Sequence, residues 1–144
     1  MLQIRHPVQW NSDGSQVALM LEAWDNKTRW LATVDFANEK LVNQHKLYDD
    51  AWINYSLNEF NWVGNDALYY LSEESGYSHL YHKALNNNKA EQLTSGKFEV
   101  SNVTLSKDQQ RFIFKANKKH PGIYEIYQVD LAKNLKALTN LGGK

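Results

Sequence analysis

The chain has 144 residues, which suits a single domain and is long enough to bury a core. Its 16 basic and 16 acidic residues cancel, and neither sign collects in a block. A nucleic-acid partner normally requires a basic face, so none is expected. The chain has no Cys, which excludes disulfides, thiolate zinc sites and cysteine nucleophiles within it.

The two ends give no sign of targeting. No window approaches eighteen apolar residues, so we expect no membrane span. The N-terminus, MLQIRHPVQW, has no apolar core of the kind that a signal peptide carries. Strand-like sequence begins almost at once, and the end at Leu141–Lys144 stops without a cap. We therefore expect an excised segment of a longer protein.

Three similar units follow one another along the chain. The first has a turn at Asn11–Gly14 and strands at Val17–Leu21 and Trp30–Phe36. Asp49–Glu59 then connects it to the second unit and is the only stretch where a helical turn is plausible. The strands expected in the second unit are Phe60–Trp62, Leu68–Leu71, His79–Leu85 and Lys89–Thr94. Those expected in the third are Val103–Leu105, Arg111–Lys115, Tyr124–Leu131 and Leu135–Thr139.

The repeat predicts the architecture. Leu31, Leu80 and Ile126 are equivalent positions, 49 and 46 residues apart. Four short strands per unit at this period are typical of β-propeller blades. A single blade cannot bury both of its faces, so neighbouring blades stack on it. We expect an all-β fold of about three four-stranded antiparallel blades, near residues 10–49, 60–100 and 101–141. Three blades form an open arc of a larger propeller, with bare end faces or self-association that covers them.

The sequence contains neither a serine-hydrolase motif nor a histidine pair spaced to bind a metal. A serine-hydrolase nucleophile elbow needs two glycines four residues apart, and none of the seven glycines are. No catalytic residue is therefore predicted in this chain. His79 and His82 are the closest histidines, but three residues apart on a strand they face opposite ways. No metal site or cofactor is expected, and the histidines are assigned structural roles.

Other polar and aromatic residues have a functional and a structural interpretation. Glu73 and Glu74 form an acidic pair that could hold an amine or a cation, but the tip of a polar hairpin favours solvated charges. Trp52 and Tyr77 could stack on a ligand, although we expect them to fill gaps between blades. Lys118–His120 is interpreted as a solvated turn.

Several motifs resemble a known family. They are Asp-Ala-Trp-Ile-Asn at 50–54, Leu-Ser-Glu-Glu-Ser-Gly-Tyr-Ser-His-Leu-Tyr at 71–81 and Gln-Leu-Thr-Ser-Gly-Lys-Phe-Glu-Val at 92–100. Ile123–Tyr127 and Ala137–Thr139 are similar to the next blade. Together they resemble the N-terminal propeller of dipeptidyl-peptidase-IV-like enzymes, in the prolyl oligopeptidase family of serine peptidases. The resemblance begins near residue 10 and is strongest over 50–100.

The resemblance implies a function for the parent protein. In this family a propeller of seven or eight blades covers an α/β-hydrolase domain with a Ser-Asp-His triad, limits access to small peptides and binds their N-termini. The hydrolase domain lies C-terminal and is absent from this chain. It is the expected partner, together with a peptide substrate, and the expected location is periplasmic or secreted.

The resemblance leaves the specificity open. Glu73 and Glu74 lie in the hairpin motif, not in the family's amine-binding pair, so dipeptidyl, aminopeptidase, oligopeptidase and acylpeptide hydrolase activities all remain. Asn54 and Tyr55 are the candidate substrate-binding residues, since they lie in the connection between two blades, where loops reach a propeller's faces.

Two other hypotheses compete with a peptidase segment. One is a non-enzymatic propeller module that binds partners at its open face, and a weaker one is an oligomerising adaptor made of these residues alone. A Gly-x-Ser-x-Gly motif encoded downstream would favour the peptidase. Light scattering would test the adaptor.

Overall fold

A computed structural model describes residues 2–4, 7–54 and 58–140. These residues form antiparallel strands connected by turns and loops, with no helix in the described ranges. The all-β prediction is confirmed.

The first sheet contains five strands. They are β1 (Leu2–Ile4), β2 (Gln9–Trp10), β3 (Val17–Ala23), β4 (Thr28–Asp35) and β5 (Lys40–Tyr48). The order is β1-β3-β4-β5, and β2 also pairs with β3. β1 lies against the Ala23 end of β3 and β2 against the Val17 end, so two short strands share one edge of the sheet. Gly14 has a φ of 74° in the turn before β3, which a residue without Cβ adopts at little cost.

The second and third sheets are four-stranded meanders, in which each strand pairs with its neighbour in the sequence. The second consists of β6 (Phe60–Val63), β7 (Ala67–Ser72), β8 (His79–Ala84) and β9 (Glu91–Gln92). The third consists of β10 (Val100–Leu105), β11 (Arg111–His120), β12 (Ile123–Asp130) and β13 (Leu135–Ala137).

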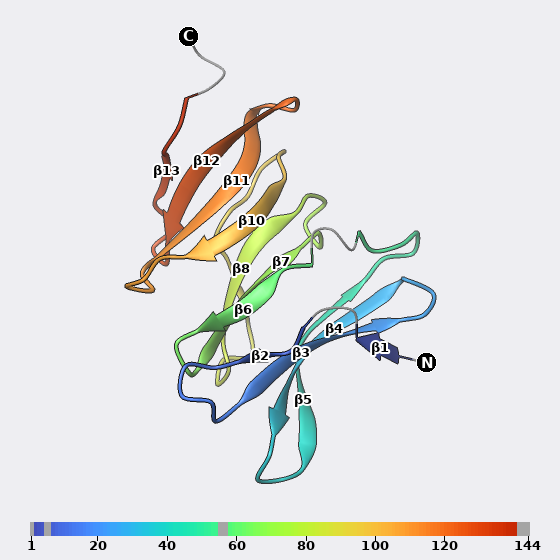
Figure 1. The fold of residues 1–144 in the computed structure, drawn as a ribbon. Helices are drawn as coiled ribbons and strands as arrows, with labels where there is room; N and C mark the ends of the chain where they lie inside the picture. The colour runs from blue at the N-terminus through green and yellow to red at the C-terminus, as the bar shows by residue number, and fades with distance from the viewer. Residues whose placement is uncertain (1, 5–6, 55–57, 141–144) are drawn as a thin grey trace.

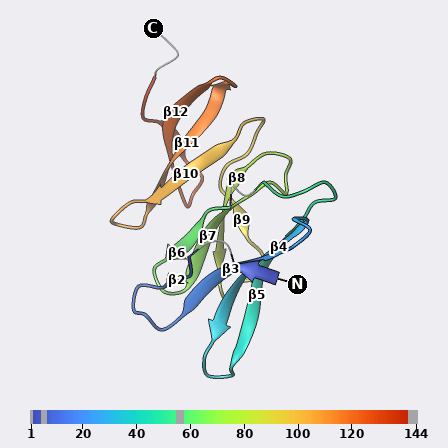
Figure 2. The same cartoon turned by 45° about the vertical axis from the view of Figure 1, so that its right-hand side comes forward.

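The three sheets stack in chain order and form an open arc (Figures 1 and 2). The first sheet carries the N-terminus at one side, and the third carries the C-terminus at the other. The expected open arc of propeller blades is confirmed.

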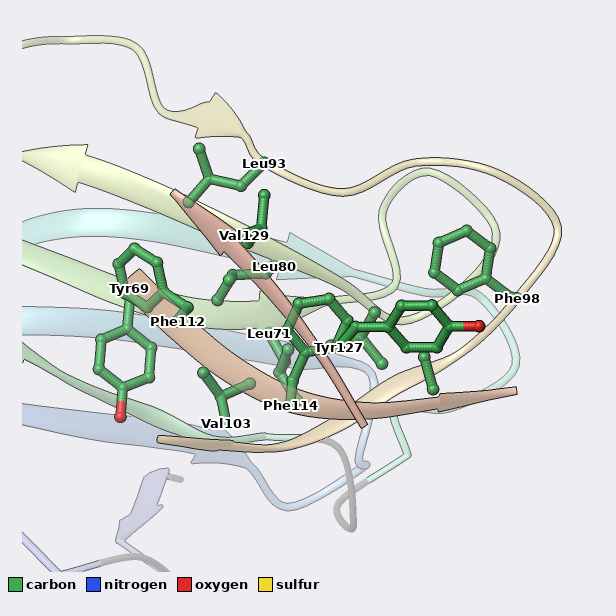
Figure 3. Close-up of a cluster of buried hydrophobic side chains, with 12 residues drawn as sticks. Tyr69, Leu71, Leu80, Leu93, Phe98, Val103, Phe112, Phe114, Tyr127 and Val129 are labelled. Carbon is green, nitrogen blue, oxygen red and sulfur yellow. The ribbon is translucent and has the colours of Figure 1, made fainter. Parts of the chain in front are cut away.

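The second sheet is buried on both faces because it lies between the other two. Leu68 and Tyr70 of β7 pack toward the first sheet, whereas Tyr69 and Leu71 pack toward the third. This explains why β7 is a continuous apolar run instead of an alternating one. Figure 3 shows the core between the second and third sheets, where Tyr69 and Leu71 meet side chains of the third sheet: Phe112, Phe114, Tyr127 and Val129.

The repeat positions occupy equivalent places. Leu31 of the first sheet packs against the second, and Leu80 of the second packs against the third. Tyr127 of the third sheet belongs to the core shared with the second, so its strand neighbour Ile126 faces away from that core. Ile126 therefore marks the face on which a fourth sheet would stack.

Candidate functional site

One end of the sheets gathers most of the polar groups that sequence analysis selected. We call it the hairpin end: the β7–β8 turn at Glu73–Ser78 together with the described residues 49–54 and 58–59 of the connection between β5 and β6. The turn closes where the Gly76 N–H donates to the Glu73 carbonyl at 2.9 Å. Ser72 supports it by donating its hydroxyl to Glu74 Oε1 at 2.9 Å.

The connection is fixed to the first sheet at its start. The Asp49 N–H donates to the Lys27 carbonyl at 2.9 Å, and the Ile53 N–H donates to the Asn26 carbonyl at 2.7 Å. The Ile53 side chain is buried. The helical turn considered plausible here does not form in residues 49–54 and 58–59, because these main-chain groups bond to the β3–β4 turn instead of to one another.

A buried polar network fixes the end of the same connection. The Arg29 guanidinium, only 1% exposed, donates to Asn58 Oδ1 and, at 3.0 Å, to the Leu71 carbonyl. Asn58 in turn donates from Nδ2 to Glu22 Oε1 at 3.2 Å. Burial lowers the pKa of Arg29 to about 10, so the group still carries its charge at neutral pH. The network therefore ties β3 and β4 to the start of the second sheet.

Glu73 and Glu74 are adjacent but have opposite environments. The Glu74 carboxylate lies 2.7 Å from His45 Nε2, and this hydrogen bond is the main cause that lowers the pKa of Glu74. Partial burial raises the pKa of Glu73, and the charge of Glu99 adds to this effect. The Asn54 backbone N–H donates to Glu73 and partly offsets both. The charged form of Glu74 is therefore stabilised, whereas the charged form of Glu73 is destabilised.

The structure brings one predicted site residue to this pair. Asn54 is exposed and lies beside Glu73, whereas Tyr55 falls outside the described residues. Trp52 is 72% exposed and Tyr77 is 38% exposed, so the expectation that they fill gaps between blades is wrong. Both belong to loops that extend past the ends of the strands.

Sequence analysis missed Arg29 and Asn58. A lone Arg in an apolar strand and a lone Asn in a connection carry no motif. Only the strand register shows that Arg29 reaches Asn58 and the Leu71 carbonyl, and that Asn58 reaches Glu22.

His79 has a structural role that its hydrogen bonds define. Its Nε2 lies 2.8 Å from the Gly96 carbonyl and therefore donates, which leaves Nδ1 to accept from the Thr94 hydroxyl at 2.9 Å. Thr94 Oγ1 also accepts from the Leu80 N–H at 3.0 Å. Burial lowers the pKa of His79, so the neutral ring is favoured. The histidine thus holds the Thr94–Gly96 segment to the start of β8.

The described residues contain no group of three His, Asp or Glu side chains that could hold a metal ion. No helix in the described part is long and apolar enough to cross a membrane. The hairpin end offers carboxylates and main-chain groups in loops that hydrogen bonds fix to the sheets, and such groups can orient a polar ligand.

Comparison with known proteins identifies a family and similar solved structures. No curated protein matches the chain. The crystal structure of Porphyromonas gingivalis dipeptidyl peptidase 4 is similar, with a TM-score of 0.79 at 15% sequence identity. The match covers 96% of this chain and 20% of that chain, and at this identity it shows a shared fold. The family model for the dipeptidyl peptidase IV N-terminal region matches residues 3–144. The chain therefore belongs to the family of dipeptidyl peptidase IV N-terminal regions.

Proposed function

We propose that the chain is a propeller segment of a serine peptidase, and that it limits access to the active site and positions peptide substrate through its hairpin end. Family membership and the shared fold support the first part. The observation that carries the second is Asn54, which is exposed at the end of the sheets while its main chain is bonded to Glu73. The proposed partner is a C-terminal α/β-hydrolase domain of the same parent chain.

Rigid support makes this end suitable for orienting a ligand. Ile53 is bonded to the β3–β4 turn, and Asn58 is held by buried Arg29. Exposed Asn54 directly follows the Ile53 anchor, so the first sheet fixes its position. A peptide bound here meets groups that need little reordering, which reduces the entropy cost of binding.

The same proposal explains the exposed apolar residues at the ends of the arc. Tyr124 of β12 and Leu138, just after β13, share the face of Ile126 and are 43% and 44% exposed. We propose that further blades of the parent cover such faces and that the isolated chain covers them by self-association. The blade limits 10–49, 60–100 and 101–141 and a periplasmic or secreted location stand as parts of this proposal.

Kinetics of the longer protein test substrate positioning. Asn54→Ala removes a polar side chain at the hairpin end, and Gln110→Ala, in the β10–β11 turn at the other end of the sheets, is the matched control. We expect Asn54→Ala to raise KM for small peptides about fivefold, as one lost hydrogen bond would, and Gln110→Ala to leave it unchanged. Equal effects would argue against positioning by this end.

A downstream sequence without Gly-x-Ser-x-Gly would favour the non-enzymatic module.

A further inference from the structure

A cavity of about 510 Å³ lies between the first two sheets, away from the hairpin end. β8 begins at the hairpin and ends at Ala84, and Leu85 just beyond it lines the cavity. The first sheet contributes Thr33 and Phe36 from β4 and its turn, and Val42 and Gln44 from β5. Nothing in the proposed peptidase role uses this cavity.

A buried polar chain forms the floor of the cavity. Gln44 sits at an irregularity of the β4–β5 ladder, where the pairing passes from Asn43 to His45 and skips it. Its Nε2 donates to Thr33 Oγ1 at 3.0 Å, and its Oε1 accepts from Lys83 Nζ at 2.7 Å. Thr33 is 3% exposed and Lys83 is 7% exposed. The Gln44 amide therefore stands between the cavity and a buried ammonium.

The floor retains unused donors. Thr33 Oγ1 accepts from Gln44, and the described part of the chain gives its hydroxyl hydrogen no acceptor. An amide nitrogen carries two hydrogens, and the second Nε2 hydrogen of Gln44 also has no acceptor in the described part of the chain. Lys83 has as acceptors only Gln44 Oε1 and the Ala84 carbonyl at 3.4 Å among the described residues, and no carboxylate. Burial accordingly lowers the pKa of Lys83. A floor of donors backed by an unneutralised cation attracts an anionic acceptor.

The walls define the rest of the ligand. Phe36, Val42 and Leu85 supply apolar surface next to the floor. Asp35 also lines the cavity, and its carboxylate accepts from the Asn38 N–H at 3.2 Å and from Asn38 Nδ2 at 2.8 Å. The Asp35 charge repels any anion, and the repulsion grows with each negative charge on the ligand, which limits the ligand to a single charge. One negative charge and a hydrocarbon body fit this arrangement.

We propose that this cavity binds a small organic monocarboxylate, with its carboxylate on Thr33 and Gln44 and its hydrocarbon part against Phe36, Val42 and Leu85. The ligand accepts the two hydrogens that the protein leaves unused. Its charge compensates Lys83 through the Gln44 amide, so binding supplies the negative charge that the buried ammonium lacks.

Amide chemical shifts of the 144-residue chain test the proposal with three matched probes: hexanoate, hexan-1-ol and hexylamine. We expect hexanoate to shift the Thr33, Gln44 and Leu85 resonances and to bind at least tenfold more tightly than the other two, as a hydrogen bond to a charged group implies. A second cavity of about 510 Å³, lined in part by Gln110 and Leu131, is the internal control and should show no such shifts. Equal binding of hexanoate and hexan-1-ol would overturn the proposal, as would shifts confined to the second cavity.

The variant Gln44→Glu separates this role from a purely structural one. Glutamate keeps the length of the side chain and its acceptor for Lys83, so the contact between the sheets is retained and becomes an ion pair. The floor then carries a negative charge, and we expect hexanoate binding to fall at least tenfold while the fold persists. Thr33→Val, which removes one donor, should weaken binding about tenfold. Unchanged hexanoate affinity in a folded Gln44→Glu protein would refute the carboxylate assignment.

Discussion

Replacing Arg29 by Leu tests the buried network that supports the hairpin end. The guanidinium is almost fully buried, and it donates both to Asn58 Oδ1 and to the Leu71 carbonyl. Leucine fills part of the same volume but donates nothing. Asn58 Oδ1 and the Leu71 carbonyl then lose a charged donor within the interface between the first two sheets.

The expected cost is large compared with the stability of a domain. Removing one partner from a buried charged network typically costs about 3–5 kcal/mol. Domains of this size have free energies of unfolding of about 5–15 kcal/mol, so the variant loses about a fifth or more of its stability. In urea unfolding followed by Trp fluorescence, this corresponds to a midpoint lowered by roughly 2 M. Arg29→Lys keeps the charge without the planar fork, and we expect an intermediate loss.

The control for this experiment is Arg111→Leu. Arg111 lies 3.7 Å from Asp108, and both side chains are about half exposed. Exposed pairs of this kind contribute about 0–1 kcal/mol, so the midpoint should change little. If Arg29→Leu costs no more than Arg111→Leu, the network does not hold the sheets together, and the argument for a rigidly supported hairpin end fails.

Four further changes test the same end. Glu74→Gln should destabilise the fold at neutral pH by up to about 1 kcal/mol, and the loss should disappear in acid, since a lowered pKa contributes stability only above the unfolded value. Glu73→Gln should stabilise it slightly at neutral pH, because a raised pKa means that the charged form is disfavoured; urea midpoints at pH 7 and pH 3 check both signs. The wild-type chain should lose stability as pH falls below about 6.5, where unfolded His79 takes up a proton that the fold disfavours, and His79→Gln should flatten this part of a stability–pH curve. Gly96→Ala should cost about 1–3 kcal/mol in urea unfolding, because φ is 126° and a Cβ would lie 2.9 Å from the Phe98 ring, whereas Gly122→Ala, with its nearest atom at 3.5 Å, should change little.

The repeat made most of the fold predictable. Leu31, Leu80 and Ile126 mark equivalent strands because each unit must present an apolar face to the next. This requirement makes apolar residues recur at a regular spacing in the sequence. Strand-like sequence was expected at the N-terminus, but β1 was not assigned to a blade, since three residues that pair with one end of β3 leave no periodic signal.

The candidate site was predictable only in part. Asn54 was selected from its place between two blades, and it lies beside Glu73. The opposite pKa shifts of Glu73 and Glu74 were not predicted. The shift of Glu74 depends on His45 from a different sheet, and that of Glu73 depends on burial and Glu99. Likewise, Gln44 and Lys83 lie 39 residues apart, and only the stacking of two sheets brings them together. Contacts between blades are set by packing, and packing leaves little trace in local sequence.

A structure of the longer protein with a slowly hydrolysed peptide bound would test the central claim most directly. The account predicts that the three sheets are consecutive propeller blades and that the peptide lies at the hairpin end, within hydrogen-bonding distance of Asn54 or its neighbours in the connection. A peptide bound at the opposite end of the sheets, beside Leu85 or Gln110, would contradict it.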